Sequence, residues 1–295
     1  MAQSKSFFGL RKGSTKSLTF QVLNGKQITK DRVFNVKNPQ TISQMNQRAL
    51  MATTIRAYSS LKAICDHSFE GFEVGAKTMS EFIKLNLNSL KNKVPNINVT
   101  EYKSQVFVNN NYIVSRGTIK PLECSLAQVN SERYNYYSTG KVAGETMTFG
   151  ELANACGLKQ DGMITIMLVA NGDLYWVRIK FTETIMSTEI TFDTNLINQI
   201  QEADSEAVEG NAVELADDIS LIKDSKDKSI VKIKVKLNQN ECAACILSQK
   251  YEGKWRRSNA ELAGDYTTNY EVGFSTYPVN TSLLLNGGKM SSNIL

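Results

Sequence analysis

The chain has few of the residues on which most enzyme chemistry depends. Its 295 residues include one histidine, His67, so a Ser-His-Asp or Cys-His arrangement has only that imidazole to use. Five cysteines, an odd number, fit reduced thiols better than a disulfide framework. No stretch approaches the roughly 18 apolar residues of a membrane span, and the N-terminus lacks the apolar core of a signal peptide. We therefore expect a cytoplasmically made protein with no membrane partner, no catalytic residue and no enzymatic activity.

Two long stretches each lack charges of one sign. Residues 1–62 contain eleven Lys or Arg and one acid, Asp31, which gives 11 − 1 = +10. Residues 183–222 contain ten Asp or Glu and no base, which gives −10. Opposed charges on one chain favour docking, either on a polyanion or on copies of the chain, over small-molecule catalysis. The acids show no calcium-loop order, so we interpret 183–222 as a solvated insertion or partly mobile loop.

Two motifs that resemble binding sites do not meet the requirements of those sites. Cys242-Ala-Ala-Cys245 has metal-site spacing, but residues three apart on a strand point to opposite faces. The glycine-containing run 9–16 lacks the Gly-Lys-Ser/Thr order of a phosphate loop and precedes a hairpin instead of a helix. His67 follows Asp66 at an expected helix end, where a capping contact is the simpler interpretation. We expect no metal site and no cofactor.

The first part of the chain, residues 1–94, is predicted to form a β-hairpin and two helices. Leu18–Leu23 alternates towards Asn24-Gly25, which favours a type I′ turn, and residues 27–34 return. Capping-box sequences at Thr41 and Thr78 precede apolar residues at helical spacing. These patterns predict helices over 41–65 and 78–92.

The second part, residues 95–295, is predicted to be rich in antiparallel strands. Residues 163–170 and 174–181 form the clearest hairpin, 229–237 alternates aliphatic residues with lysines, and 243–250 is a further strand. Many short strands with turns favour an antiparallel β-sandwich that is immunoglobulin-like in broad shape. The predicted fold class is α+β, a hairpin and two-helix unit joined to this sandwich, which carries the acidic insertion at about 183–222.

The predicted hairpin carries the candidate interface residues, which are Lys16, Lys26, Lys30 and Arg32. A simpler interpretation is that these are solvated charges that protect the edge of a two-stranded ribbon. A DNA-binding accessory protein would use the same basic region, although no helix-turn-helix, finger or ribonucleoprotein signature is present. A carbohydrate binder needs clustered exposed aromatic residues, and we expect the one such cluster, at 134–137, to serve packing or an interface.

Six segments of the chain carry a further signal: Asn24-Gly25-Lys26-Gln27, Asn38-Pro39-Gln40-Thr41, Gln44-Met-Asn-Gln47-Arg48, Asp66-His67-Ser68-Phe69-Glu70-Gly71, the helix from Gly75 to Asn86, and Gly253-Lys254-Trp255-Arg256-Arg257-Ser258. Together they resemble a family of unknown function that is widespread in Bacteroidetes and in the crAss-like tailed phages that infect them. The similarity is strongest over 7–90, recurs at 163–181 and near Trp255, and is weak over 95–150 and 183–228.

The resemblance implies a virion structural protein of a short-tailed phage, made in the host cytoplasm. The implied role is a subunit of a ring in the tail or the head-to-tail connector. Its partners would be copies of itself and other phage tail or connector proteins, with nucleic acid as a less favoured partner. Opposed charged patches suit a head-to-tail contact that closes into a ring.

Overall fold

The computed structural model describes residues 13–23, 26–32, 42–72, 75–93, 108–109, 111–129, 131–141, 144–170, 173–211, 219–238, 241–264 and 267–268. The chain divides into two compact units, Met1–Ile42 with Asn280–Leu295, and Ser43–Val279. The division therefore falls near residue 42 and not between residues 94 and 95, where the sequence places it. The reason is that the two helices share a core with the strands that follow them.

The first unit contains a small antiparallel sheet of order β1-β2-β3, made of Gly13–Ser14, Leu18–Leu23 and Lys26–Asp31. Strands β2 and β3 pair from Leu18 opposite Asp31 to Leu23 opposite Lys26, over residues predicted to form a hairpin. The predicted turn residues, Asn24 and Gly25, and the end of the predicted return strand lie outside the described residues.

The second unit begins with two helices, α1 (Ile42–Cys65) and α2 (Ala76–Lys93). The bounds of α1 agree with the prediction. Helix α2 begins before Thr78, whose hydroxyl donates to the Gly75 carbonyl at 2.6 Å inside the first turn. The predicted capping box is wrong, because the Glu81 carboxylate instead accepts from Arg116 at 3.2 Å.

Two antiparallel sheets follow, one of order β10-β9-β8-β13-β14 with β16 beside β13, and one of order β11-β12-β7-β6. Two further short pairs are β15-β5 and β17-β4. The strands are β4 (Val108–Asn109), β5 (Ile113–Ser115), β6 (Glu123–Val129), β7 (Glu132–Lys141), β8 (Met163–Ala170), β9 (Asp173–Lys180), β10 (Val208–Gly210), β11 (Ile219–Lys223), β12 (Ile230–Leu237), β13 (Glu241–Tyr251), β14 (Lys254–Arg257), β15 (Ala260–Glu261), β16 (Ala263–Gly264) and β17 (Thr267–Thr268). The fold class is thus α+β with mostly antiparallel sheets.

The two larger sheets repeat one path along the chain. Strands β6 and β7 form a hairpin in one sheet, and β8 and β9 form the next hairpin in the other sheet. Strands β11 to β14 repeat this order, and the inner strands of the two runs pair as β7 with β12 and β8 with β13. Strands β9 and β14 therefore occupy equivalent positions on either side of the central β8-β13 pair.

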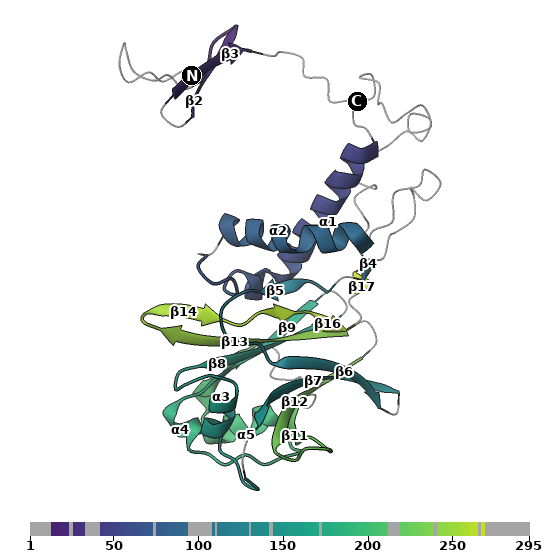
Figure 1. Cartoon of the computed structure of the whole chain (residues 1–295), viewed down its shortest axis with the longest axis vertical. Coiled ribbons are helices and arrows are strands. Elements are labelled where there is room, and N and C mark those ends of the chain that lie inside the picture. Colours follow the sequence, from purple (N-terminus) through teal and green to yellow (C-terminus); the bar gives the residue numbers. More distant parts are fainter. Residues whose placement is uncertain are drawn as a thin grey trace. The chain divides into compact units, whose positions relative to one another are not determined.

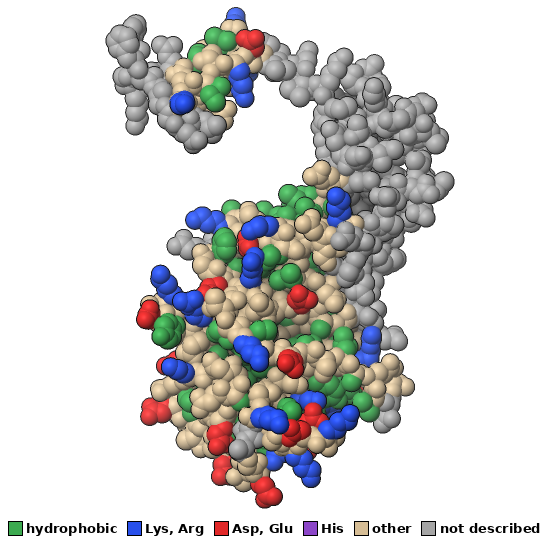
Figure 2. All heavy atoms as spheres, in the orientation of Figure 1, with side chains coloured by type: hydrophobic (Ala, Val, Ile, Leu, Met, Phe, Trp, Pro, Cys, Tyr) green, Lys and Arg blue, Asp and Glu red, His purple; other side chains and the backbone are tan. Residues whose placement is uncertain are grey.

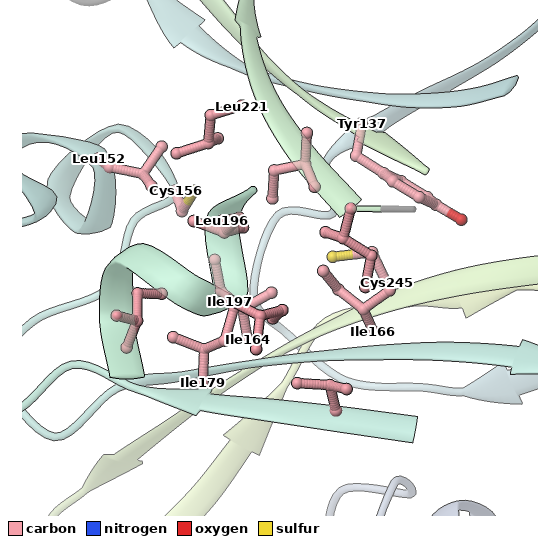
Figure 3. Close-up of a cluster of buried hydrophobic side chains, with 14 of the residues drawn as sticks. Tyr137, Leu152, Cys156, Ile164, Ile166, Ile179, Leu196, Ile197, Leu221 and Cys245 are labelled. Carbon is pink, nitrogen blue, oxygen red and sulfur yellow. The ribbon is translucent and has the colours of Figure 1, made fainter. Parts of the chain in front are cut away.

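The second unit has three layers (Figure 1). Helices α1 and α2 cover one face of the β8-β13 sheet, where Phe82 and Leu61 pack with Met167 and Ile246. The opposite face of that sheet meets the β7-β12 sheet across a larger core (Figure 3). Strand β12 shows the predicted alternation, since four of its five aliphatic residues are buried there: Val231, Ile233, Val235 and Leu237.

The acidic stretch is not the solvated insertion that its charge predicts. After α3 (Phe149–Ala155) and the β8-β9 hairpin, it folds into α4 (Glu183–Met186), α5 (Leu196–Ala203), a 3-10 turn (Ser205–Ala207), β10 and β11. Ile197, Ile200 and Leu221 are fully buried in the larger core. Residues 212–218, which include three of the ten acids, lie outside the described residues. In the described part the aliphatic residues between the acids decide the structure, since one helix face packs while six of the seven described acids are exposed.

Candidate functional site

The candidate interface residues lie on the small sheet of the first unit. Every residue of β3 is exposed, and Lys26 and Lys30 share one face of this strand with Ile28, which is 41% exposed. The register places Lys30 opposite Thr19 and Ile28 opposite Gln21 on β2. This face therefore presents two lysines on either side of an exposed isoleucine.

The other two candidates lie at one end of the same sheet. Lys16 is exposed in the connection between β1 and β2. Arg32 follows β3; its amide donates to the Ser17 carbonyl at 2.7 Å and its guanidinium to the Thr15 carbonyl at 3.2 Å. Arg32 thus fixes the β1-β2 connection, and the structure brings Lys16 and Arg32 together there.

The second face of the small sheet is apolar on β2 and polar on β3, which places Gln27, Thr29 and Asp31 there. Leu18, Phe20 and Val22 alternate along β2 and are half-buried, and Phe20 lies opposite Gly13 of β1. The outer edge of β3 pairs with no other strand in the described part of the chain. A sheet with two lysines on one face of its edge strand, an apolar strip on β2 and an open edge is suited to main-chain pairing with another protein.

In the second unit, the structure joins two segments that are far apart in the sequence. The Glu70 carboxylate accepts from the Thr118 amide at 2.9 Å, the Arg257 amide at 3.2 Å and the Arg256 guanidinium at 3.0 Å. Burial raises the pKa of Glu70, but these hydrogen bonds outweigh burial and the pKa is lowered. The charge pattern gives no sign of Glu70, because its donors lie 48 to 187 residues away.

A buried polar group holds the end of α1 on α2. Tyr58 donates to the Asp66 carboxylate, and Thr78 lies 3.1 Å from the Tyr58 hydroxyl. Burial, followed by the bond to Asp66, raises the pKa of Tyr58 to about 12. The Asp66 carboxylate thus faces α2, while at the end of α1 the His67 amide donates to the Ile64 carbonyl at 3.1 Å.

The thiols of Cys242 and Cys245 are buried, which lowers their reactivity. Cys242 packs in the core beneath the helices and Cys245 in the core between the sheets, as expected for residues three apart on a strand. Burial raises the pKa of both thiols. Within the described ranges, no group of three or more His, Cys, Asp or Glu is arranged to hold a metal ion.

The tyrosine cluster serves packing, as the sequence predicts. Tyr137 is 2% exposed in the larger core and Tyr134 is buried on β7. The Lys234 ammonium lies 4.2 Å from the centre of the Tyr134 ring. These contacts leave no exposed row of aromatic rings here for a sugar to stack on.

The charges of the second unit are mixed in space although they are sorted along the chain. Figure 2 shows acidic and basic side chains interspersed over the visible face, including the end that carries α4, α5 and β11. Glu209 of the acidic stretch, for example, pairs with Arg178 at 3.3 Å. Among the helices that the structure describes, none is long and apolar enough to cross a membrane.

No protein-family model, curated protein or solved structure matches this chain.

Proposed function

We propose that this protein is a virion structural protein of a short-tailed phage, a subunit of a tail or head-to-tail connector ring. The observation that carries the proposal is the small sheet of the first unit, with its fully exposed β3 and open strand edge. Such an edge can add to the sheet of a neighbouring subunit through main-chain hydrogen bonds, and Lys26 and Lys30 would select an acidic partner surface.

The chemistry of the second unit supports an assembly role. Its buried thiols have raised pKa values, and its tyrosine cluster and the aliphatic residues of the acidic stretch are used for packing. The partners in this proposal are copies of the chain and other tail or connector proteins. The location is the virion, after synthesis in the host cytoplasm.

We also propose an immunoglobulin-like sandwich, in the broad sense, for the β-rich part. What supports this is the pair of antiparallel sheets around one core. At the centre of each sheet, strands from distant parts of the chain are paired, β7 with β12 in one sheet and β8 with β13 in the other. An experimental structure that lacked either pairing would remove this description.

Deletion of residues 1–36 tests the assembly role. We expect the shortened chain to unfold cooperatively in urea, since Ser43–Val279 is a compact unit with its own core, and to lose self-association in sedimentation velocity. A shortened chain that still assembles would show that the small sheet is not the contact. Mass spectrometry of purified virions gives the independent test of location.

Charge reversal tests whether the lysines of β3 bind a partner or only protect the edge of the sheet. The double variant Lys26→Glu, Lys30→Glu should weaken association, whereas Lys62→Glu, Lys77→Glu, which changes two exposed helix lysines of the second unit, should not. Equal behaviour of both variants would support the edge-protection interpretation. If the unaltered chain stays monomeric and binds duplex DNA with an affinity that falls steeply with salt, the DNA-binding alternative replaces the proposal.

A further inference from the structure

A cavity of about 240 Å³ lies on the helix-covered face of the β8-β13 sheet, beside the end of α1. Its lining includes two arginines, Arg178 and Arg257, together with His67 and the hydroxyl residues Thr165 and Ser248. Among the lining residues that the structure describes, none is an aspartate or a glutamate. The cavity thus presents two cationic groups and several hydrogen-bonding groups, beside the apolar side chains of Ile64, Met163 and Ile246 and the Trp255 ring.

The two arginines come from the equivalent strands of the repeated path. Arg178 lies on β9 opposite Thr165 of β8, and Arg257 ends β14 opposite Ser248 of β13. Strands β8 and β13 are themselves neighbours, with Thr165 opposite Ile246. The two guanidinium groups therefore reach the same cavity from its two sides, across the central strand pair.

Each arginine is held by a tryptophan two residues before it on the same strand face. The Arg178 guanidinium carbon lies 5.1 Å from the centre of the Trp176 ring, and that of Arg257 lies 4.8 Å from the Trp255 ring centre. These are the two tryptophans of the chain, so both occur as Trp-x-Arg. Arg257 Nε also donates to the His67 carbonyl at 2.8 Å, which orients its guanidinium plane.

Two described carboxylates near this pair, Glu209 and Glu70, are engaged outside the cavity. Glu209 pairs with Arg178 at 3.3 Å but is 68% exposed, whereas Arg178 is 25% exposed. Glu70 binds Arg256 and the backbone amide of Arg257. Burial and then the charge of Arg178 lower the pKa of Arg257 to about 10, against an opposing contribution from Glu70. The two guanidinium groups thus repel each other in a partly dehydrated place.

We propose that this cavity binds a small tetrahedral oxyanion of the phosphate class, held between Arg178 and Arg257. An anion there relieves the repulsion, and each planar guanidinium can donate paired hydrogen bonds to its oxygens. The volume is below the roughly 300–1,000 Å³ of typical small-molecule sites, which favours a free anion or a short phosphomonoester over a nucleotide. The site lies in the second unit, so it is independent of the proposed role of the small sheet.

The tryptophans make the test direct. Inorganic phosphate is titrated into the full-length chain at constant ionic strength, with chloride as the balancing salt, and tryptophan fluorescence is recorded. We expect a saturable change, since both rings contact the binding arginines. Arg178→Gln and Arg257→Gln should each raise the phosphate Kd at least tenfold, which is about 1.4 kcal/mol.

Lys254→Gln is the matched control, because it removes one exposed positive charge from β14 on the face opposite Arg257. Its phosphate Kd should stay within about twofold of the unaltered chain. Phosphate should also raise the melting temperature of the unaltered chain, and this measurement does not depend on whether a variant folds. A fluorescence change that does not saturate with phosphate, or equal phosphate affinities for the arginine variants and Lys254→Gln, would overturn the proposal. Displacement of phosphate by sulfate but not by further chloride would support it.

Discussion

Replacement of Ile200 by alanine tests whether the acidic stretch is part of the core. Ile200 is 0% exposed on α5 and packs with Leu196 and Ile197 in the larger core. The change removes three carbon atoms from a buried site, which is about 2.4 kcal/mol of transfer free energy at about 0.8 kcal/mol per carbon. The cavity that remains adds to this, so we expect a loss of about 3–4 kcal/mol in the free energy of unfolding.

Urea unfolding and thermal melting give the measurement. For a unit of this size, about 3–4 kcal/mol corresponds to a fall of roughly 6–16 °C in Tm. The control is Asn198→Ala on the exposed face of the same helix, which should change stability by no more than about 0.5 kcal/mol. A solvated insertion would give equal, small effects for the two variants, and that result would refute the packing argument.

Three further changes test other parts of the structure. Tyr58→Phe should lower the free energy of unfolding by about 1–3 kcal/mol, because it leaves the buried Asp66 carboxylate with one donor fewer. Folding also raises the pKa of Tyr58 from about 10 to about 12, so the unaltered chain should lose stability between pH 10 and 12 more steeply than the variant. Parallel curves of stability against pH would contradict this. Of the five cysteines, Cys124 is the exposed residue and the other four are buried. A thiol reagent should therefore modify one cysteine in the native chain, slowly because burial raises the pKa of the Cys124 thiol, and none in Cys124→Ser. Labelling of several cysteines in the native chain would contradict the packing of the others. In Gly117→Ala the new Cβ would lie 2.2 Å from the Arg257 carbonyl oxygen, and we expect a loss of about 1–3 kcal/mol in a melting experiment, against little change for Gly140→Ala, where the nearest atom is 3.4 Å away.

Local periodicity predicts the elements whose side chains follow one simple pattern. Helix α1 and strand β12 are of this kind because each has one apolar face, and the β8-β9 hairpin is of this kind because β8 is apolar on both faces. Strand β7 was not predicted, since Asn135 and Thr139 occupy buried positions on it and hide the alternation. Tertiary contacts satisfy part of their hydrogen-bonding capacity: Asn135 Nδ2 donates to the Ala263 carbonyl and the Thr139 hydroxyl to the Val231 carbonyl, while Asn135 Oδ1 accepts from no group of the described residues.

The candidate binding residues also fall into those that the sequence indicates and those that only the structure reveals. The four cations of the first unit were selected from the sequence because charge sorting along a chain is visible there. The cationic cavity was not, although each Trp-x-Arg places its two side chains on one strand face. Nothing local indicates that Trp176-Val-Arg178 and Trp255-Arg-Arg257 stand on either side of one strand pair.

The sequence by itself determined the α+β composition and the positions of those helices and hairpins whose residues follow a local pattern. It also determined that the two thiols of Cys242-Ala-Ala-Cys245 lie on opposite faces of their strand. Each of these features depends on the geometry of a few neighbouring residues. Only the tertiary structure decided that the acidic stretch is a packed part of the core and that Arg178 and Arg257 share a cavity. The physical reason is that burial and charge proximity depend on pairing between strands about 80 residues apart in the chain, as in β8 with β13, and no local pattern encodes which distant strands will meet.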